Sequence, residues 1–234
     1  MAQNNKARLR SGVDYKPRNY FQNTRAEMAE FLPDNAQNII EVGCGEGVFG
    51  QMLKKHFSGS IVWGIEIDAA AVPQAKKQLD RVLKGDIDGL WDKIPNNHFD
   101  LVVFNDVLEH MIDPYSVLKK IQTKLKPGGY IVSSIPNIRY YHTLHALVMA
   151  GEFEYQESGV LDRTHLRFFT QKSIRRMYER LGYNIVRHSG INPMPSPPLR
   201  FKFLEMLSKK RFDDMRYEQF ATLAQHTKGE KRKK

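Results

Sequence analysis

Four side chains that could move a proton or bind a metal ion lie in two short segments of the chain. Asp106, Glu109 and His110 directly follow an apolar segment, and His165 lies in a polar segment further on. If residues 106–110 are helical, the first three side chains share one face of the helix. Imidazoles and carboxylates can remove the proton of a hydroxyl, and both also bind divalent ions. Three roles are therefore open for these residues: a general base with a carboxylate that orients it, a metal site, or polar side chains that support a pocket.

A glycine-rich loop precedes these residues. The sequence Glu41-Val-Gly-Cys-Gly-Glu-Gly47 follows the apolar run Asn38-Ile-Ile, and glycines allow a backbone to lie close to a ligand. Val48 stands where a dinucleotide-binding G-x-G-x-x-G motif would have its last glycine. The loop contains two carboxylates and no Lys or Arg, which disfavours a pyrophosphate and favours a ligand with a positive centre. S-adenosylmethionine, a sulfonium without phosphate, is such a ligand.

Acidic residues also end the next two predicted strands. Glu66 ends an apolar strand about 20 residues after the glycine loop, where nucleoside sites of βαβ units place a carboxylate for the ribose hydroxyls. Asp86 ends a third short strand, where it could accept a hydrogen bond from an adenine amino group. Acids at three successive strand ends predict a nucleoside site.

With these features the chain resembles the class I S-adenosylmethionine-dependent methyltransferases, over about residues 18 to 226. The motifs that carry the resemblance are EVGCGEG (41–47), GIEID (64–68), KGDI (84–87), FDLVVFNDVLEHMIDP (99–114), LKPGGYIVSSIPN (125–137) and DRTHLRFFTQKSI (162–174). The resemblance implies S-adenosylhomocysteine as product and a cofactor site made of Glu41, Gly43, Cys44, Gly45, Gly47, Glu66, Ile67, Asp86, Ile87 and Asn105. The last two motifs, with Tyr20 and Arg25, resemble a subgroup often encoded with cell-envelope or polysaccharide biosynthesis enzymes.

A second resemblance concerns the possible metal site. An acid-x-x-Glu-His motif with a distant His is similar to the ligand set of small-RNA 3′-end 2′-O-methyltransferases, and ubiquinone-pathway O-methyltransferases share a similar motif. Asp106 stands where those families usually have Glu. We therefore expect His110, His165, Asp106 and Glu109 to be catalytic without a metal. A divalent ion bound by the same four residues is the alternative.

The order of predicted elements indicates an α/β fold. Strands alternate with helices, as in a parallel sheet, and the family resemblance implies a Rossmann-like, doubly wound, mostly parallel seven-stranded sheet with an antiparallel last strand. The expected helices span about 19–32, 46–56, 70–79, 114–126 and 171–182. The predicted organisation is a basic arm (1–18), a methyltransferase domain (19–226) with an insertion at about 137–168 and a Pro-rich linker (193–198), and a basic tail (227–234).

The insertion is expected to act as a lid. Arg163 and Arg167 flank His165 and would bring positive charge over the cofactor, which suits an acceptor with a carboxylate or phosphate. Tyr20 and Arg25 would close the other side. The aromatic pair at 168–169 is expected in the core.

The net charge of +10 is concentrated at the two ends of the chain. Residues 1–25 carry +5 and residues 228–234 carry +4, which leaves about +1 for the rest. These ends either are solvated or contact a polyanion. The polyanion would be a nucleic acid, or an anionic membrane that bears a lipid-linked substrate. A single cysteine excludes a disulfide framework. Without a long apolar run or a signal sequence, the chain is expected in the cytoplasm.

We therefore expect a methyltransferase that acts on an oxygen of a sugar, glycolipid or other small hydroxylated metabolite. Two alternatives stay open: an RNA 2′-O-methyltransferase, and a protein that binds the cofactor without catalysis. The oligomeric state is not predicted.

Overall fold

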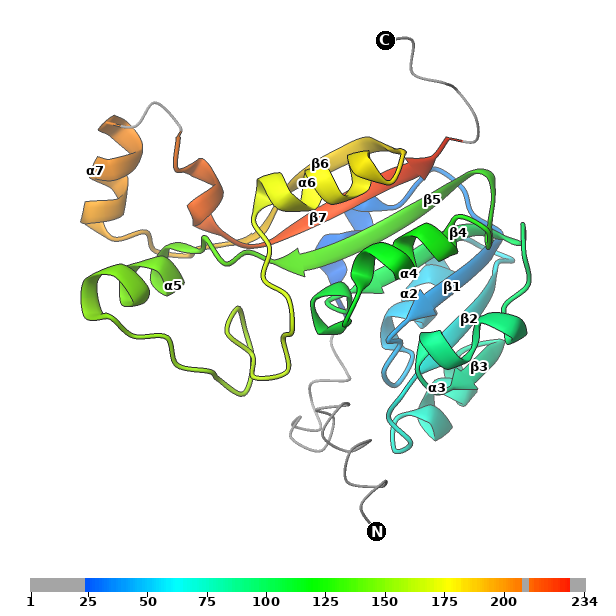
Figure 1. Cartoon of the computed structure of the whole chain (residues 1–234). Coiled ribbons are helices and arrows are strands. Elements are labelled where there is room, and N and C mark those ends of the chain that lie inside the picture. Colours follow the sequence, from blue (N-terminus) through cyan, green and yellow to red (C-terminus); the bar gives the residue numbers. More distant parts are fainter. Residues whose placement is uncertain (1–23, 208–210, 228–234) are drawn as a thin grey trace.

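A seven-stranded sheet forms the centre of the computed structural model, which describes residues 24–207 and 211–227 (Figure 1). The strand order is β3-β2-β1-β4-β5-β7-β6. Strands β1 to β5 are parallel to one another, whereas β7 is antiparallel to both β5 and β6. The predicted doubly wound, mostly parallel sheet with an antiparallel last strand is confirmed. The strands are β1 (Asn38–Val42), β2 (Ile61–Glu66), β3 (Arg81–Lys84), β4 (Phe99–Asn105), β5 (Leu125–Pro136), β6 (Tyr183–Pro193) and β7 (Tyr217–His226).

Helices cover both faces of the sheet. On one face, α4 (Pro114–Ile121) and α6 (Gln171–Arg180) bury Leu118, Ile121, Met177 and other apolar side chains against the strands. On the other face lie the 3-10 helix η3 (Ala26–Phe31), α2 (Val48–His56) and α3 (Val72–Gln78). Each helix therefore contributes one apolar stripe to the core, as expected for a doubly wound sheet.

The starts of two helices follow from their capping residues. Asp113 accepts hydrogen bonds from the backbone N–H groups of Tyr115 and Ser116 at 3.1 Å, and Pro114 occupies the first turn of α4. Thr170 and Ser173 form a reciprocal capping box at the start of α6. Both features satisfy backbone donors that a helix start leaves open.

Two predicted helices differ from the structure. The helix that begins at Pro114 ends at Ile121 and not near residue 126, because Leu125 already pairs with Phe99 in the sheet. The helix predicted over 19–32 is a 3-10 helix from Ala26 to Phe31 in the described part. Its predicted first residues, 19–23, lie outside the described residues.

The register of the sheet aligns the strand ends that matter for function. Val42 of β1 pairs with Ile65 of β2 and with Phe104 of β4, and Asn105 pairs with Ser134 of β5. The loops after β1, β2 and β4 therefore leave the sheet at one edge. Ligands of open α/β sheets bind at this carboxyl edge.

The insertion leaves the sheet after β5 and returns at Phe169. It contains α5 (Tyr141–His145), a π-helical turn (Ala146–Ala150) and an irregular segment over 151–168, called the strap below. Asn137 is fully buried and anchors its start, since its side-chain amide donates to the carbonyl oxygens of Asp214 at 2.8 Å and Tyr217 at 3.0 Å.

Strand β6 continues to Pro193, so the proline-rich linker begins one residue later than predicted. It leads to α7 (Leu199–Leu207), which lies with α5 at one end of the molecule (Figure 1). Among the described helices, none combines the length and the apolar composition needed to cross a bilayer.

Candidate active site

The glycine-rich loop after β1 has the backbone that its sequence predicts. Gly43, Gly45 and Gly47 have φ angles of 71°, 54° and 85°, a region that side chains disfavour. A Cβ at position 43 would also lie 2.6 Å from Cγ2 of Val107. The loop is bonded to the end of β2, because the N–H groups of Gly43 and Cys44 donate to the carbonyl oxygen of Ile65 at 2.8 and 3.1 Å.

Glu66 connects the glycine loop to the end of β2. Its two carboxylate oxygens accept hydrogen bonds, both of 2.7 Å, from the N–H groups of Gly45 and Asp68. The side chain is 4% exposed, and desolvation raises its pKa above the ordinary value. The structure thus brings Glu66 against the glycine loop, where its oxygens could accept hydrogen bonds from ribose hydroxyls.

Glu41 is the second buried acid at this edge. It is 2% exposed, and desolvation together with the nearby Glu66 raises its pKa to about 8. A buried acid of this kind ionises more readily when a cation comes close. The positive groups of S-adenosylmethionine could supply that cation.

The remaining candidates for the adenosine part lie at the ends of β2, β3 and β4. Ile67 is 43% exposed directly after Glu66, and Ile87 is buried in the turn that follows β3. Asp86 caps this turn by accepting a hydrogen bond of 3.1 Å from the N–H of Asp88. Asn105 is the last residue of β4. All four residues therefore lie at the carboxyl ends of strands, where an adenosine is expected from the sequence.

Asp106 does not share a helical face with Glu109 and His110. Its φ angle of 53° is left-handed, and the following 3-10 helix η6 (Leu108–His110) begins only after Val107. The Asp106 carboxylate accepts hydrogen bonds from Arg25, from Ser134 at 2.6 Å and from Gln219 at 2.9 Å. The expected helical face shared by Asp106, Glu109 and His110 is therefore wrong.

This Asp106 network joins four elements of the fold. Arg25 ion-pairs with Asp106 and donates to Oγ of Ser134 at 2.6 Å. The ion pair with Arg25 lowers the pKa of the Asp106 carboxyl, so it stays ionised despite its burial. The network holds the segment before η3 across the ends of β4, β5 and β7. Ser134 and Gln219 were not predicted from the sequence as site residues. Tyr20, which was predicted to act with Arg25, lies outside the described residues.

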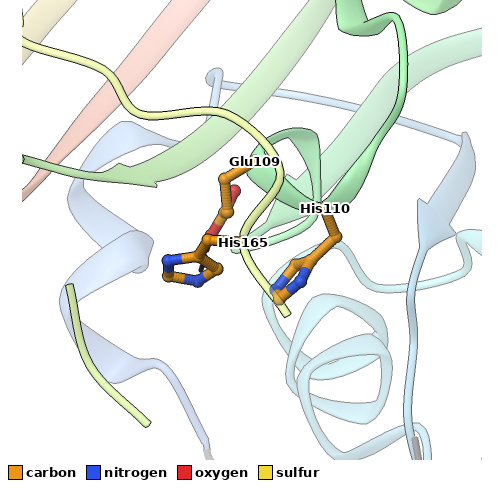
Figure 2. Close-up of side chains that lie close together, drawn as sticks. All are labelled: Glu109, His110 and His165. Carbon is orange, nitrogen blue, oxygen red and sulfur yellow. Dashed lines mark ion pairs between the residues drawn. The ribbon is translucent and has the colours of Figure 1, made fainter. Parts of the chain in front are cut away.

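Glu109, His110 and His165 converge, as Figure 2 shows. The two imidazole rings lie edge to face with centroids 4.7 Å apart, and Nε2 of His165 is 3.9 Å from Oε1 of Glu109. The contact joins residues that are far apart in the sequence. It is fixed by the strap, because the N–H groups of Leu166 and Arg167 donate to the carbonyl oxygen of Glu109 at 2.9 and 3.0 Å.

Backbone oxygens orient both imidazoles. Nδ1 of His165 lies 3.0 Å from the carbonyl oxygen of Val160, and Nδ1 of His110 lies 3.1 Å from that of Thr164. A carbonyl can only accept, so each Nδ1 carries the proton and each Nε2 carries the lone pair in the neutral ring. Thr164 is itself positioned by Asp162, which accepts from its hydroxyl at 2.7 Å. Asp162 and Thr164 were not predicted as orienting residues, although their Asp-x-Thr spacing is typical of a side-chain-bonded turn and could have indicated them.

Glu109 is a buried acid whose oxygens accept no hydrogen bond among the described residues. It is 1% exposed. Desolvation and the nearby Asp106 carboxylate raise its pKa well above the ordinary value. A protonated Glu109 could donate to the lone pair of His165 Nε2, or a cation could take the place of that proton.

The three residues also suit a divalent ion. Each offers one ligand atom, and these atoms lie within 4.8 Å of one another. Two nitrogen or oxygen ligands of a tetrahedral zinc ion stand about 3.4 Å apart, so these side chains would have to rotate toward one another to hold the ion. Three protein ligands with one open position are typical of catalytic zinc sites. Asp106, the fourth residue of the predicted set, is not part of this group.

The predicted lid residues Arg163 and Arg167 are exposed on the strap. Arg163 is exposed and ion-pairs with Glu157, and Arg167 donates to the carbonyl oxygen of Ile112 at 2.6 Å. Of the aromatic pair, Phe169 is buried as predicted, whereas Phe168 is 37% exposed, so its assignment to the core is wrong. Phe168 instead contacts the exposed rings of Phe153 and Tyr155.

Comparison with known proteins agrees with this geometry. The family model described as a methyltransferase domain matches residues 15–188. Ubiquinone biosynthesis O-methyltransferases of Coxiella burnetii and Nitrosospira multiformis are 26% and 28% identical over 167 residues, which are 68% of this chain and 68% and 67% of those proteins. A SAM-dependent methyltransferase from Archaeoglobus fulgidus superposes with a TM-score of 0.62 at 17% identity, covering 90% of this chain and 95% of that one. The chain belongs to the methyltransferase domain family and is an S-adenosylmethionine-dependent methyltransferase of class I.

Proposed function

We propose that the protein transfers the methyl group of S-adenosylmethionine to a hydroxyl oxygen of a small molecule, such as a sugar, a glycolipid or another hydroxylated metabolite. The proposal rests on the convergence of Glu109 and His110, which follow β4, with His165 of the strap. A neutral amine or a thiolate needs little more than positioning for methyl transfer, whereas a hydroxyl gains from a group that removes its proton. Two imidazoles that carry their lone pairs on Nε2 can provide that base.

His165 is the proposed base. Its Nδ1 proton is bonded to Val160 and its Nε2 faces Glu109. As the acceptor oxygen bonds to the methyl carbon, the carbon–sulfur bond of S-adenosylmethionine breaks and S-adenosylhomocysteine leaves as a neutral thioether. The hydroxyl proton would pass to Nε2 of His165. The positive imidazolium would then lie beside Glu109 and favour the ionised form of that carboxyl group. The relatives whose names denote O-methyltransferases support oxygen as the acceptor atom.

A divalent ion is the second way in which these residues could activate a hydroxyl. Glu109, His110 and His165 would hold it, and it would lower the pKa of an acceptor hydroxyl. Both readings place the acceptor at the same three side chains.

The test compares His165→Ala with His142→Ala, an exposed histidine of the same insertion outside the cluster. Transfer of labelled methyl from S-adenosylmethionine to a panel of catechols and hydroxylated sugars would be measured, with cofactor affinity in parallel. We expect His165→Ala to lower turnover by about 10²–10⁴-fold while cofactor affinity is kept, and His142→Ala to leave both unchanged. Full activity of His165→Ala would refute the proposal.

Chelation separates the two readings. If an ion is required, a chelator abolishes turnover and added Mn²⁺ or Zn²⁺ restores it. Titration calorimetry then shows one ion bound by the unaltered protein and none by Glu109→Gln. If His165 acts without an ion, the chelator has no effect and Glu109→Gln binds as little ion as the unaltered protein.

A further inference from the structure

Helix α7 exposes an apolar face. Leu199, Phe203 and Met206 are 83%, 59% and 69% exposed. These positions are spaced i, i+4 and i+7, so the three side chains lie along one side of the helix. Isolated exposed apolar side chains are common, but a continuous row of large ones on a soluble protein usually marks an interaction surface.

The opposite side of α7 is fixed to the fold. Phe201 is fully buried and packs against Tyr141 of α5, with ring centroids 4.9 Å apart, and against Met194 and Met215. Glu205 ion-pairs with Arg216 at 2.8 Å. The helix is therefore held in place from one side, and its exposed apolar row is a feature of the packed structure.

The apolar row is bordered by positive charge. Arg200 and Lys202 are exposed on α7, and Arg211 is exposed shortly after it. Residues 199–211 contain five Lys or Arg and one acid, which gives a net charge of +4. The single acid, Glu205, is already neutralised by Arg216.

A second apolar group lies at the same end of the molecule. Val148 and Met149 of the π-helical turn are 72% and 70% exposed. This turn continues α5, which contacts α7 through Tyr141 and Phe201, and both helices extend beyond the ends of β5, β6 and β7 (Figure 1).

We propose that the α7 face, defined as Leu199, Arg200, Lys202, Phe203 and Met206, docks on the surface of an anionic lipid bilayer. Apolar side chains that enter the boundary of headgroups and acyl chains, next to cations that meet anionic headgroups, are typical of helices that lie in a membrane interface. A second copy of the chain suits this face less well. A two-fold contact would place the same cations against each other.

The first test reports whether α7 itself enters the interface. The chain has one cysteine, Cys44, and it is buried, so a cysteine at position 203 can be labelled selectively. Phe203→Cys would carry a polarity-sensitive fluorophore and would be mixed with vesicles of phosphatidylcholine with and without phosphatidylglycerol. We expect a shift to an apolar environment only with the anionic vesicles. Val186→Cys is the matched control, since Val186 is 52% exposed on β6, and its probe should remain in water.

The second test measures binding of the full chain to the same vesicles. The triple variant Leu199→Ser, Phe203→Ser, Met206→Ser should bind at least about 10-fold more weakly. Arg200→Gln with Lys202→Gln should weaken binding by about 10- to 30-fold and reduce its salt dependence. Val186→Ser should bind like the unaltered protein. Melting temperature and S-adenosylmethionine affinity, measured on every variant, show that the fold is kept.

Three results would overturn the proposal. In the first, the full chain does not bind anionic vesicles. In the second, the chain binds but the probe at position 203 stays in water, which would assign binding to the basic ends. In the third, the triple variant binds vesicles normally and converts a dimer of the chain into a monomer, which would make the α7 face a contact between copies. Vesicle binding needs neither acceptor nor turnover, so these results are independent of the proposed reaction.

Discussion

Replacing Glu41 by glutamine should remove a pH dependence from the stability of the cofactor-free protein. Burial and the neighbouring Glu66 raise the pKa of Glu41 from 4.5 to about 8. The folded protein thus keeps a proton that the unfolded chain releases near pH 4.5. Since the unfolded state binds fewer protons in this range, the free energy of unfolding falls as the pH rises from 4.5 to 8. This is the reverse of the usual case of an acid with a lowered pKa.

The size of the effect follows from the shift. Each pKa unit corresponds to about 1.4 kcal/mol, so this one group would cost the folded state about 5 kcal/mol above pH 8. Glutamine has nearly the same shape and no proton to release. Glu41→Gln should therefore match the unaltered protein at low pH and be more stable than it at high pH.

The assay is urea unfolding without cofactor at about pH 5.5 and pH 8.5, where linkage predicts the larger difference at the higher pH. Glu46→Gln, an acid of the same loop, is the matched control and should keep the pH dependence of the unaltered protein. If Glu41→Gln unfolds with the same pH dependence as the unaltered protein, Glu41 is not a buried neutral acid.

Four further predictions concern the cofactor site, the fold and the tail. Glu66→Ala should weaken S-adenosylmethionine binding by about 1.5–3 kcal/mol in calorimetry, because a charged acceptor is lost, and an unchanged affinity would remove Glu66 from the site. Gly64→Ala should lower the free energy of unfolding by about 1–3 kcal/mol, because its Cβ would lie 2.5 Å from Sγ of Cys44; equal stability would show that the loop can shift. Asn137→Ala should lower the free energy of unfolding by about 1–3 kcal/mol, because it leaves two partly buried carbonyl oxygens without their donor; equal stability in urea unfolding would show that Asn137 does not anchor the insertion. Deletion of 228–234 should preserve melting temperature and cofactor affinity, and a loss of either would give the tail a role in the fold.

The parts of the site that follow regular strands were predictable from the sequence. A strand that runs into glycines, and acids at the next strand ends, specify where side chains emerge because parallel strands end at one edge. Gly43, Gly45 and Gly47 adopt the positive φ angles that only glycine reaches easily. The capping residues Asp113 and Thr170 likewise marked two helix starts.

The parts that depend on tertiary contacts were not predictable. Asp106 was expected on a helix, but Arg25, Ser134 and Gln219 hold it in a left-handed conformation. Such a conformation depends on partners far away in the sequence. The burial of Phe168 was also predicted wrongly, because the strap presents one aromatic ring to the core and the next to solvent.

Transfer of an isotopically labelled methyl group would test the proposed O-methylation at Glu109, His110 and His165. An extract of cells that lack the protein would be incubated with purified protein and S-adenosylmethionine labelled at its methyl group, and the new products would be identified by mass spectrometry and NMR. We expect a labelled methyl ether on a small molecule, formed by the unaltered protein and by His142→Ala but absent with His165→Ala. A label on nitrogen or carbon, or equal labelling by His165→Ala, would contradict this expectation.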